Sequence, residues 1–306
     1  MARTLITGGT GLLGRALGKA LVAQGHDVRM LGRRAGGVDG IPVLVWDPSR
    51  RTMDPGALEG VERIVHLAGA GIADKRWSGS RVRELIASRA DSAEFLLELT
   101  RTMDVRPEVI VSSAGIDRYG ASTSDAILTE DDPPGNDTIG RICQAWESAV
   151  DRWEGTCRTV KLRLPIVLAR EGGALPRMAT PVRWGLGAPL GTGRQWMNWV
   201  HIDDAVRAFV HALDDGGMSG AYHVTSSDPK RNRDFMRELA RALHKPFILP
   251  AVPGFALRLV LGGMATVLLN GTRASHGKLL ATGFQLKHPT LREALGDLLG
   301  SHVRNA

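Results

Sequence analysis

Two kinds of hydrophobic pattern alternate through the first two-thirds of the chain. Short apolar runs, typical of buried strands, are separated by longer segments in which apolar residues recur every three or four positions, as on one face of a helix. The predicted strands span residues 2–7, 27–32, 42–46, 62–67, 107–113 and 157–164. The predicted helices span residues 12–24, 79–101 and 137–151. This alternation predicts an α/β fold with a doubly wound parallel sheet.

The pattern changes after about residue 170, where glycines surround tryptophans and arginines. Four further helices are predicted, at residues 203–214, 231–243, 254–269 and 289–299. We therefore predict two parts, residues 1–170 and a smaller, mainly helical cap over residues 171–306. Strands and helices up to about residue 225 would also contribute to the first part, and the cap would include a small C-terminal domain at about 248–300.

The longest apolar stretch, residues 255–269, contains Arg258. It is short for a bilayer span, so we expect a buried helix and no membrane contact. The apolar run at residues 4–6 is too short for the core of a secretory signal. Cys143 and Cys157 are the only cysteines, which predicts neither a disulfide framework nor a zinc site and favours a reducing cytoplasm.

The first predicted strand leads directly into a glycine-rich turn. Gly8, Gly11 and Gly14 differ by one residue from the Rossmann spacing Gly-x-Gly-x-x-Gly. Gly8 would permit the tight turn, Gly11 would let the backbone approach a pyrophosphate, and Gly14 would let the helix pack closely on the strand. The diphosphate would lie at the free N–H groups of the helix start. We therefore predict a Rossmann domain that holds a dinucleotide through Gly8, Thr10, Gly11, Leu12, Leu13 and Gly14.

The end of the second strand bears on the choice of nicotinamide cofactor. NAD enzymes usually place an acidic residue here to bind the ribose hydroxyls, whereas this chain has Arg33 and Arg34 after Gly32. Because a guanidinium pairs with a 2′-phosphate, the sequence favours NADP(H) over NAD(H), with Arg33 as the phosphate ligand. Solvated loop charges are the alternative. The fourth strand ends in small residues that would let the backbone approach the cofactor ribose, namely Leu67, Ala68 and Gly69.

The charge balance adds little to this picture. There are 39 Lys and Arg residues against 32 Asp and Glu, for a formal net charge of +7. The basic residues are scattered, with no run of like charge and no interleaved aromatic platform, so we expect no nucleic-acid partner. Part of the surplus would serve a phosphate-rich cofactor.

Motifs spread over nearly the whole chain carry a family resemblance. They include the glycine turn, residues 66–73, Arg76-Trp77, Ser88-Arg89, Ser112-Ser113-Ala114, Tyr119-Gly120, Trp146-Glu147, residues 172–176, Gln195-Trp196 and residues 199–204. The chain resembles the extended, epimerase-like form of the short-chain dehydrogenase/reductase superfamily. It is most similar to an atypical branch, the NAD(P)-dependent epimerase family proteins, some of which are called cell-division inhibitors. Gly283-Phe284, Pro289 and Leu291 resemble that branch's small appended domain of unknown function.

The resemblance implies chemistry that the chain does not supply in the usual way. Superfamily reductases use a Tyr-x-x-x-Lys pair, in which the lysine lowers the tyrosine pKa for proton exchange. Glu147 resembles the glutamate that follows this lysine by four residues, which puts Cys143 at the lysine position and Ile139 at the tyrosine position. The only tyrosines are Tyr119 and Tyr222, so the sequence contains no Tyr-x-x-x-Lys. Ordinary carbonyl reduction therefore needs another proton donor.

Other residues would have to take these roles. Ser113, at the end of the fifth strand, fits the superfamily's serine position, and Ser112 is the neighbouring option. Tyr119 lies six residues further on and is the reserve proton donor, with a ring that closes the pocket wall as the alternative. Pro165 and Val167, after the sixth strand, would pack on the nicotinamide side of the cofactor.

Tryptophans and arginines in the matching segments predict a pocket for a planar or anionic small-molecule substrate. The alternative is that the tryptophans are core anchors. The predicted pocket residues are Arg76, Trp77, Arg89, Trp146 and Trp196. His201, Asp203 and Asp204 precede a predicted helix, and we interpret them as a helix cap and not as a metal site.

We therefore hypothesise an NADP(H)-binding oxidoreductase or epimerase-like enzyme, whose substrate the sequence does not name. The alternative is a non-catalytic NADP(H)-binding sensor or regulatory protein. The missing Tyr/Lys pair favours this alternative, whereas the predicted pocket argues against it. The resemblance also implies a homodimer formed through helices that flank the sheet.

Overall fold

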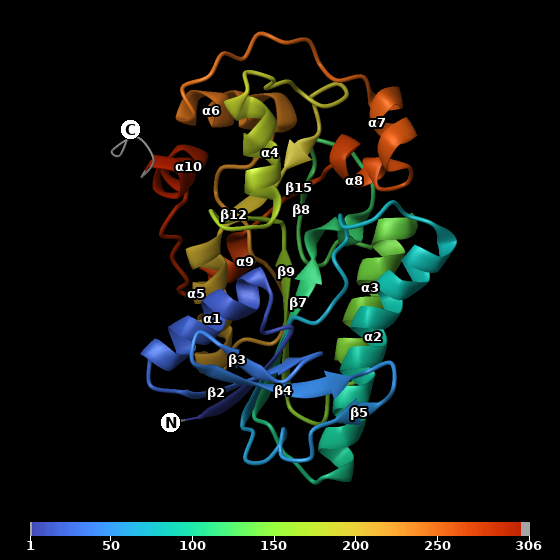
Figure 1. The fold of residues 1–306 in the computed structure, drawn as a ribbon, viewed down its shortest axis with the longest axis vertical. Helices are drawn as coiled ribbons and strands as arrows, with labels where there is room; N and C mark the ends of the chain where they lie inside the picture. Colours follow the sequence, from blue (N-terminus) through green and yellow to red (C-terminus); the bar gives the residue numbers. More distant parts are fainter. Residues whose placement is uncertain (1, 301–306) are drawn as a thin grey trace.

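A nine-stranded sheet forms the centre of the computed structural model, which describes residues 2–300 (Figure 1). Its strands are β1 (Arg3–Thr7), β2 (Asp27–Gly32), β3 (Gly36–Val38), β4 (Ile41–Asp47), β5 (Thr52–Met53), β6 (Arg63–His66), β7 (Val109–Gly115), β9 (Arg158–Leu164) and β13 (Gly220–His223). The strand order is β13-β9-β7-β6-β1-β2-β4-β3, and β5 pairs with the free side of β4. All pairs except those of β3 and β5 are parallel. The predicted α/β fold class is confirmed.

The strand order reverses at β1, which lies between β2 and β6. The chain leaves β1 for α1 (Leu12–Ala23) and returns to the sheet at β2, whereas β6, β7 and β9 extend the sheet on the other side of β1. Loops diverge at such a reversal, so the crevice at the carboxyl ends of β1 and β6 is where ligands bind in open α/β sheets.

Helices cover both faces of the sheet. In Figure 1, α1 and α5 (Ile202–Asp214) lie on one side, and α2 (Gly79–Thr102) and α3 (Thr138–Asp151) lie on the other. Leu17 and Phe209 are fully buried on the first side. Phe95 and Trp153 are buried on the second. Each face of the sheet thus has its own apolar layer, as a doubly wound fold requires.

The second part of the chain builds a core of its own at the carboxyl edge of the sheet. It contains β10 (Ile166–Leu168), α4 (Ala174–Arg183), β12 (Trp199–His201), α6 (Asn232–Ala242) and α10 (Leu291–Leu299). Short pairs add to it, namely β11 (Trp196–Met197) with β14 (Lys230–Arg231), and β8 (Ile127–Leu128) with β15 (Arg273–Ala274). The sequence pattern did not predict α4, because Pro181 lies inside it and interrupts its helical signal.

The predicted buried helix over residues 254–269 is wrong in two respects. Gly262, with φ +59°, ends α7 (Gly254–Leu261), and α8 (Ala265–Leu269) begins after it. No residue of α7 is buried, and Phe255 and Leu259 are 73% and 75% exposed. Apolar composition alone therefore misjudged the burial of this segment. Within residues 2–300, no helix combines the length and the hydropathy needed to cross a membrane.

Candidate functional site

The glycine turn after β1 is a backbone cradle that leaves no room for side chains at Gly8 and Gly14. Gly8 has φ +66°, and a Cβ atom there would lie 2.8 Å from the backbone of Leu67. A Cβ at Gly14 would lie 2.6 Å from the Gly8 carbonyl oxygen, so the start of α1 packs directly on the turn. No side chain caps this helix at Gly11, and its first turn contains no acidic residue. The turn therefore fits the diphosphate of a dinucleotide, which backbone N–H groups at a helix start can bind.

The loop after β6 lies against this turn and is held by a hydroxyl group of β1. Thr7 Oγ1 accepts hydrogen bonds from the backbone N–H groups of Leu67 and Ala68, both at 3.1 Å. The same oxygen lies 2.9 Å from Nδ1 of His66, which is fully buried. Ser88 Oγ on α2 accepts a hydrogen bond from the N–H of Ala70 at 3.0 Å. The predicted cofactor loop at Leu67, Ala68 and Gly69 is therefore fixed from both sides.

The hydrogen bonds around His66 define its tautomer. Because Thr7 Oγ1 accepts from two backbone N–H groups, its own hydrogen is directed to His66 Nδ1, so Nδ1 is the acceptor. The ring hydrogen then resides on Nε2, which lies 3.3 Å from Ser92 Oγ. Burial lowers the pKa of His66 to about 4, so the neutral ring is the form that supports the loop.

The end of β2 also reaches the glycine turn. A Cβ at Gly32 would lie 3.5 Å from the methyl carbon of Thr10, which places the two loops side by side. Arg33 follows Gly32, and its side chain is exposed and makes no ion pair or hydrogen bond with any residue in the range 2–300. Its guanidinium is therefore free to meet a phosphate beside Thr10.

A loop from the second part of the chain closes the other side of the turn. Val167 lies in β10, after Pro165, and pairs with Val200 of β12. The following loop returns so that a Cβ at Gly172 would lie 3.4 Å from a methyl carbon of Leu12. The chain after β9 thus packs on the first turn of α1, next to the predicted pyrophosphate site.

The carboxyl end of β7 presents serines whose hydroxyl groups are already engaged. Ser112 and Ser113 are buried, and their hydroxyls lie 3.4 Å and 3.3 Å from the carbonyl oxygen of His66. Across from this strand, Ile139 and Cys143 of α3 are 3% and 1% exposed and belong to an apolar cluster between α2 and α3. Burial raises the pKa of the Cys143 thiol far above its usual range, so a thiolate nucleophile is disfavoured.

Tyr119 lies in a buried polar network. Its hydroxyl oxygen accepts a hydrogen bond from Arg163 Nη1 at 2.7 Å and lies 2.6 Å from both the Thr129 carbonyl oxygen and His223 Nε2. Arg163 in turn makes a two-point ion pair with Glu147, at 2.8 Å and 2.9 Å. Burial raises the pKa of Tyr119 to about 12. These contacts fit a structural role for Tyr119, in which its hydroxyl group links the surrounding loops, better than the role of a proton donor. The catalytic role of Tyr119 stays a prediction.

The predicted pocket residues fall into three groups. Arg89 lies over the ring of Trp146, with its Cζ 4.8 Å from the ring centroid. Arg76 and Trp77 pack against the glycine pair between α7 and α8. Trp196 lies under Arg231 and Arg273 and donates a hydrogen bond to Asp125. The structure therefore pairs Arg89 with Trp146 and Arg76 with Trp77, and gives Trp196 a different set of neighbours.

The His201 cluster connects the start of α5 to residues 287–288. His201 Nδ1 accepts from the N–H of Asp203 at 3.1 Å and caps α5, as predicted. Asp204 is fully buried and accepts from the backbone N–H groups of Lys287 and His288, at 2.7 Å and 2.8 Å. Nitrogen and oxygen atoms of His201, Asp203 and His288 lie within 4.8 Å of one another. Since Nδ1 of His201 is an acceptor, its Nε2 carries the hydrogen and cannot ligate a metal ion in the neutral ring.

Comparison with known proteins assigns the chain to a family. The model of the NAD dependent epimerase/dehydratase family matches residues 4–224, and a domain of unknown function, DUF1731, matches residues 252–298. The chain belongs to the NAD dependent epimerase/dehydratase family. An epimerase family protein of Mycobacterium leprae is 35% identical over 95% of this chain and 93% of its own length. A chloroplastic SDR39U1 homolog of Arabidopsis thaliana is 31% identical over 96% and 86%.

Solved structures agree with this family assignment. The human epimerase family protein SDR39U1, crystallised with NADPH, has a TM-score of 0.88 and 31% identity, over 97% of this chain and 99% of that one. MoeE5 in complex with UDP-glucuronic acid and NAD has a TM-score of 0.79 at 18% identity, which shows the shared fold alone. The resemblance to an atypical, epimerase-like branch of the short-chain dehydrogenase/reductases is thus confirmed.

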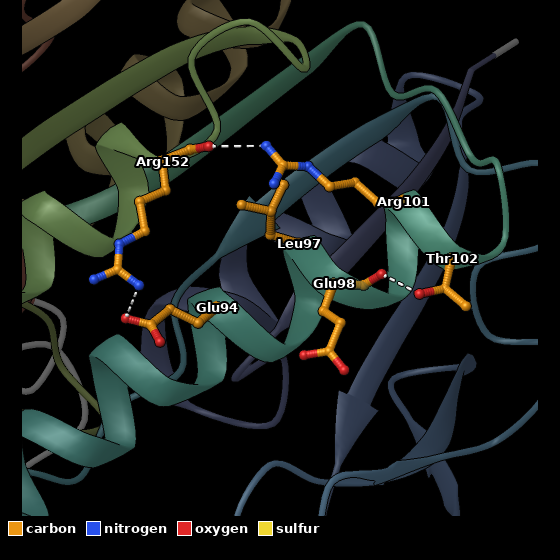
Figure 2. A pocket seen from close by; sticks show the side chains of 6 residues that line it. All are labelled: Glu94, Leu97, Glu98, Arg101, Thr102 and Arg152. Atoms are coloured by element: carbon orange, nitrogen blue, oxygen red, sulfur yellow. Dashed lines mark hydrogen bonds and ion pairs between the residues drawn. The ribbon is translucent and has the colours of Figure 1, made fainter.

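One hollow on this family member lies away from the glycine turn. It has a volume of about 590 Å³ and is lined by Glu94, Leu97, Glu98, Arg101, Thr102 and Arg152 (Figure 2). Glu94 and Arg152 form an ion pair at 2.8 Å across it. These residues belong to the C-terminal half of α2 and the end of α3, whereas Ser88 and Arg89 precede them on α2. The groove is open and charged, and it carries none of the predicted site residues.

Sequence analysis gave Thr7 and Ser92 no role in the site, and named Ser88 and Gly172 only as parts of family motifs. Thr7, Ser88 and Ser92 hold the loop after β6, and Gly172 brings the second part of the chain to Leu12. Single hydroxyl groups have no diagnostic spacing, so periodicity could not reveal them. The position of Thr7 immediately before the glycine turn was the one available signal.

Proposed function

We propose that this family member is an NADP(H)-binding oxidoreductase or epimerase-like enzyme that acts on a small molecule. The observation that carries the proposal is the cradle formed by Gly8, Gly11 and Gly14 at the reversal of the strand order, with the loop after β6 closed against it. A Cβ atom at Gly8 would clash with the backbone of Leu67, and one at Gly14 with the backbone of Gly8, so the turn, the loop after β6 and the start of α1 pack closely together. The free N–H groups at the start of α1 could then bind a diphosphate. Bound NADP(H) would supply or accept a hydride.

Two observations support NADP(H) over NAD(H). Arg33 extends without a partner from the end of β2, in a position where NAD enzymes need an acidic residue. The SDR39U1 structure contains NADPH, whereas two epimerases that share the fold at lower identity, a UDP-glucose 4-epimerase and a UDP-glucuronic acid 4-epimerase, have structures with NAD. A 2′-phosphate at Thr10 and Arg33 would form charge-assisted hydrogen bonds that NAD(H) cannot make.

Within this proposal, the chain's own residues position the substrate and exclude water. Ser113 lies at the end of β7, beside the loop that Thr7 and His66 hold, and would orient a substrate oxygen there. Val167 and Leu12 would form the apolar wall on the nicotinamide side. A cytoplasmic location and a homodimer remain predictions of the sequence.

A specific observation favours a second candidate, a non-catalytic NADP(H) sensor. Ile139 and Cys143, which the resemblance puts at the positions of the superfamily's tyrosine and lysine, are packed in the core, and burial raises the pKa of Tyr119 to about 12. No proton donor with a pKa near neutrality thus stands at these three positions. Turnover of NADPH by the Tyr119→Phe variant at the wild-type rate would still identify an enzyme, with its proton donor elsewhere.

Calorimetric titration with NADPH and NADH tests the proposed function. Replacement of Arg33 by Ala should weaken NADPH binding about tenfold to a hundredfold, as expected for one charge-assisted contact, and leave NADH binding unchanged. Arg106→Ala is the matched control, since this side chain is 85% exposed and paired only with Asp104. Absence of binding of either nucleotide by the wild type would refute the proposal. An equal loss for both nucleotides in Arg33→Ala would refute the 2′-phosphate contact.

A further inference from the structure

One buried cation near the site has no counter-charge. Arg81, Arg89 and Arg163 are the buried arginines among residues 2–300, each at most 6% exposed. Arg163 pairs with Glu147, and Arg81 pairs with Glu84 at 2.7 Å. Arg89 has no carboxylate partner within this part of the chain. Its Nη1 and Nη2 donate to the neutral carbonyl oxygens of Leu85 and Ala70, at 3.0 Å and 2.9 Å.

A buried Arg89 charge without a carboxylate partner destabilises the folded protein unless a ligand supplies the missing negative charge. Burial lowers the pKa of Arg89 to about 10, which reports how unfavourable the charged form is in this position. Nε of Arg89 is buried and makes no hydrogen bond. Nε1 of Trp146, in the ring on which Arg89 stacks, is likewise buried without a partner. Stacking on an indole offsets part of the cost, but it satisfies neither N–H group.

The guanidinium lies directly behind the cofactor loop. A Cβ atom at Gly69 would be 3.0 Å from Arg89 Cζ, and Gly69 belongs to the loop that meets the glycine turn. The charge of Arg89 acts to lower the pKa of the Cys143 thiol on α3, although burial raises that pKa overall. A Cβ at Gly115, the last residue of β7, would lie 2.8 Å from Cys143 Sγ. Arg89 thus lies beside the loop that follows β6, at the carboxyl edge of the sheet.

We propose that Arg89 binds a carboxylate group of the substrate, with the Trp146 N–H group as a second donor. The inference rests on the proposed function, because it assigns the substrate class of the same site. Nη1 and Nη2 of Arg89 already donate to Leu85 and Ala70, so Nε of Arg89 and Nε1 of Trp146 are the donors left for a carboxylate. One unpaired guanidinium also balances a single negative charge, which favours a monocarboxylate over a phosphate dianion. The loop at Gly69 places this carboxylate beside the cofactor.

Titrations with acetate, benzoate and pyruvate, in the presence and absence of NADPH, test the assignment. Wild-type protein should bind at least one of them, followed by tryptophan fluorescence and thermal unfolding, and should not bind the neutral analogue benzamide. Arg89→Gln should weaken carboxylate binding about tenfold or more, Arg89→Lys should retain part of it, and Trp146→Phe should weaken it less. Arg106→Gln is the control. NADPH affinity should stay within about threefold of the wild-type value in every variant, as expected when no cofactor contact is lost.

Several outcomes would overturn the proposal. Equal carboxylate binding by the wild type and Arg89→Gln would exclude Arg89, and no binding of any of the three by the wild type would exclude the site. If inorganic phosphate binds more tightly than every carboxylate, the substrate class would be a phosphate and not a carboxylate. Parallel loss of NADPH and carboxylate affinity in Arg89→Gln would assign Arg89 to the cofactor instead. If Arg89→Gln does not fold, Arg89→Lys and Trp146→Phe still test the proposal, because unchanged carboxylate binding in both variants would exclude the site. Failure of NADPH binding by the wild type would refute the proposed function separately, since the carboxylates are also titrated alone.

Discussion

Acidification should destabilise this protein through His66. The ring is fully buried below the cofactor loop, and burial lowers its pKa to about 4 from 6.5. Because the folded pKa is below the unfolded one, the unfolded chain takes up a proton first as the pH falls. Stability is therefore fully present above about pH 6.5 and is lost as the pH approaches 4. The difference between the folded and unfolded pKa values of His66 corresponds to about 3 kcal/mol in the free energy of unfolding.

The substitution His66→Asn isolates this contribution. An asparagine can place an acceptor oxygen near the position of Nδ1 and cannot titrate, so the bond from Thr7 can persist. Folded pKa values are also lowered at His201, His223 and His276, so the wild-type profile alone would mix several groups. Urea unfolding at pH 7.5, 6.5, 5.5 and 4.5, followed by circular dichroism, gives the free energy of unfolding of each variant.

We expect His66→Asn to be less stable than the wild type at pH 7.5, and the gap to narrow by about 2–3 kcal/mol by pH 4.5. Protonation would place a second N–H against Thr7, so NADPH binding by the wild type should weaken over the same range. Parallel stability profiles for the two proteins would refute the reasoning, because they would show that His66 does not titrate between pH 6.5 and 4.

Three further predictions concern packing and charge. Gly14→Ala should abolish measurable NADPH binding in calorimetry, because its Cβ would lie 2.6 Å from the Gly8 carbonyl oxygen and the backbone would have to move. Glu147→Gln should lower the free energy of unfolding by about 3–5 kcal/mol in urea, because Arg163 keeps a buried charge without compensation; a loss below about 1 kcal/mol would contradict the buried pair. Cys143→Lys should destabilise the fold by adding a second buried cation beside Arg89, and addition of Arg89→Leu should recover part of the loss, as a double-mutant cycle would measure.

The sheet and the glycine turn could be predicted because their signals are local. Leu5 and Ile6 are fully buried in β1, and the turn that follows needs glycines for steric reasons that its spacing reveals. The failures arose where burial depends on distant segments. Helix α4 contains Pro181, so its hydrophobic periodicity did not predict a helix. Helix α7 is apolar but not buried, so its composition did not predict its exposure.

The site was predicted less completely than the fold. The sequence indicated Arg89 and Trp146 as pocket residues among several tryptophans and arginines of equal weight. Arg81 and Glu84 have the i,i+3 spacing of a helical ion pair, so this pairing could have been predicted from the sequence. Only the three-dimensional contacts show that Arg163 on β9 meets Glu147 on α3 and that Arg89 meets no carboxylate among residues 2–300.

The missing Tyr-x-x-x-Lys motif and the unpaired Arg89 both concern the seam where α2 packs against α3. In the superfamily that this chain resembles, α3 would present a cation at position 143, where this chain has a buried thiol. Arg89 comes from the facing helix and lies close enough to affect the pKa of that thiol, so the seam still holds one cation at the edge of β6 and β7. A single buried cation there can be stabilised by one anion, whereas a lysine and Arg89 together would repel each other. If position 143 corresponds to the superfamily's lysine, as the resemblance implies, the positive charge of this site comes instead from Arg89 on α2.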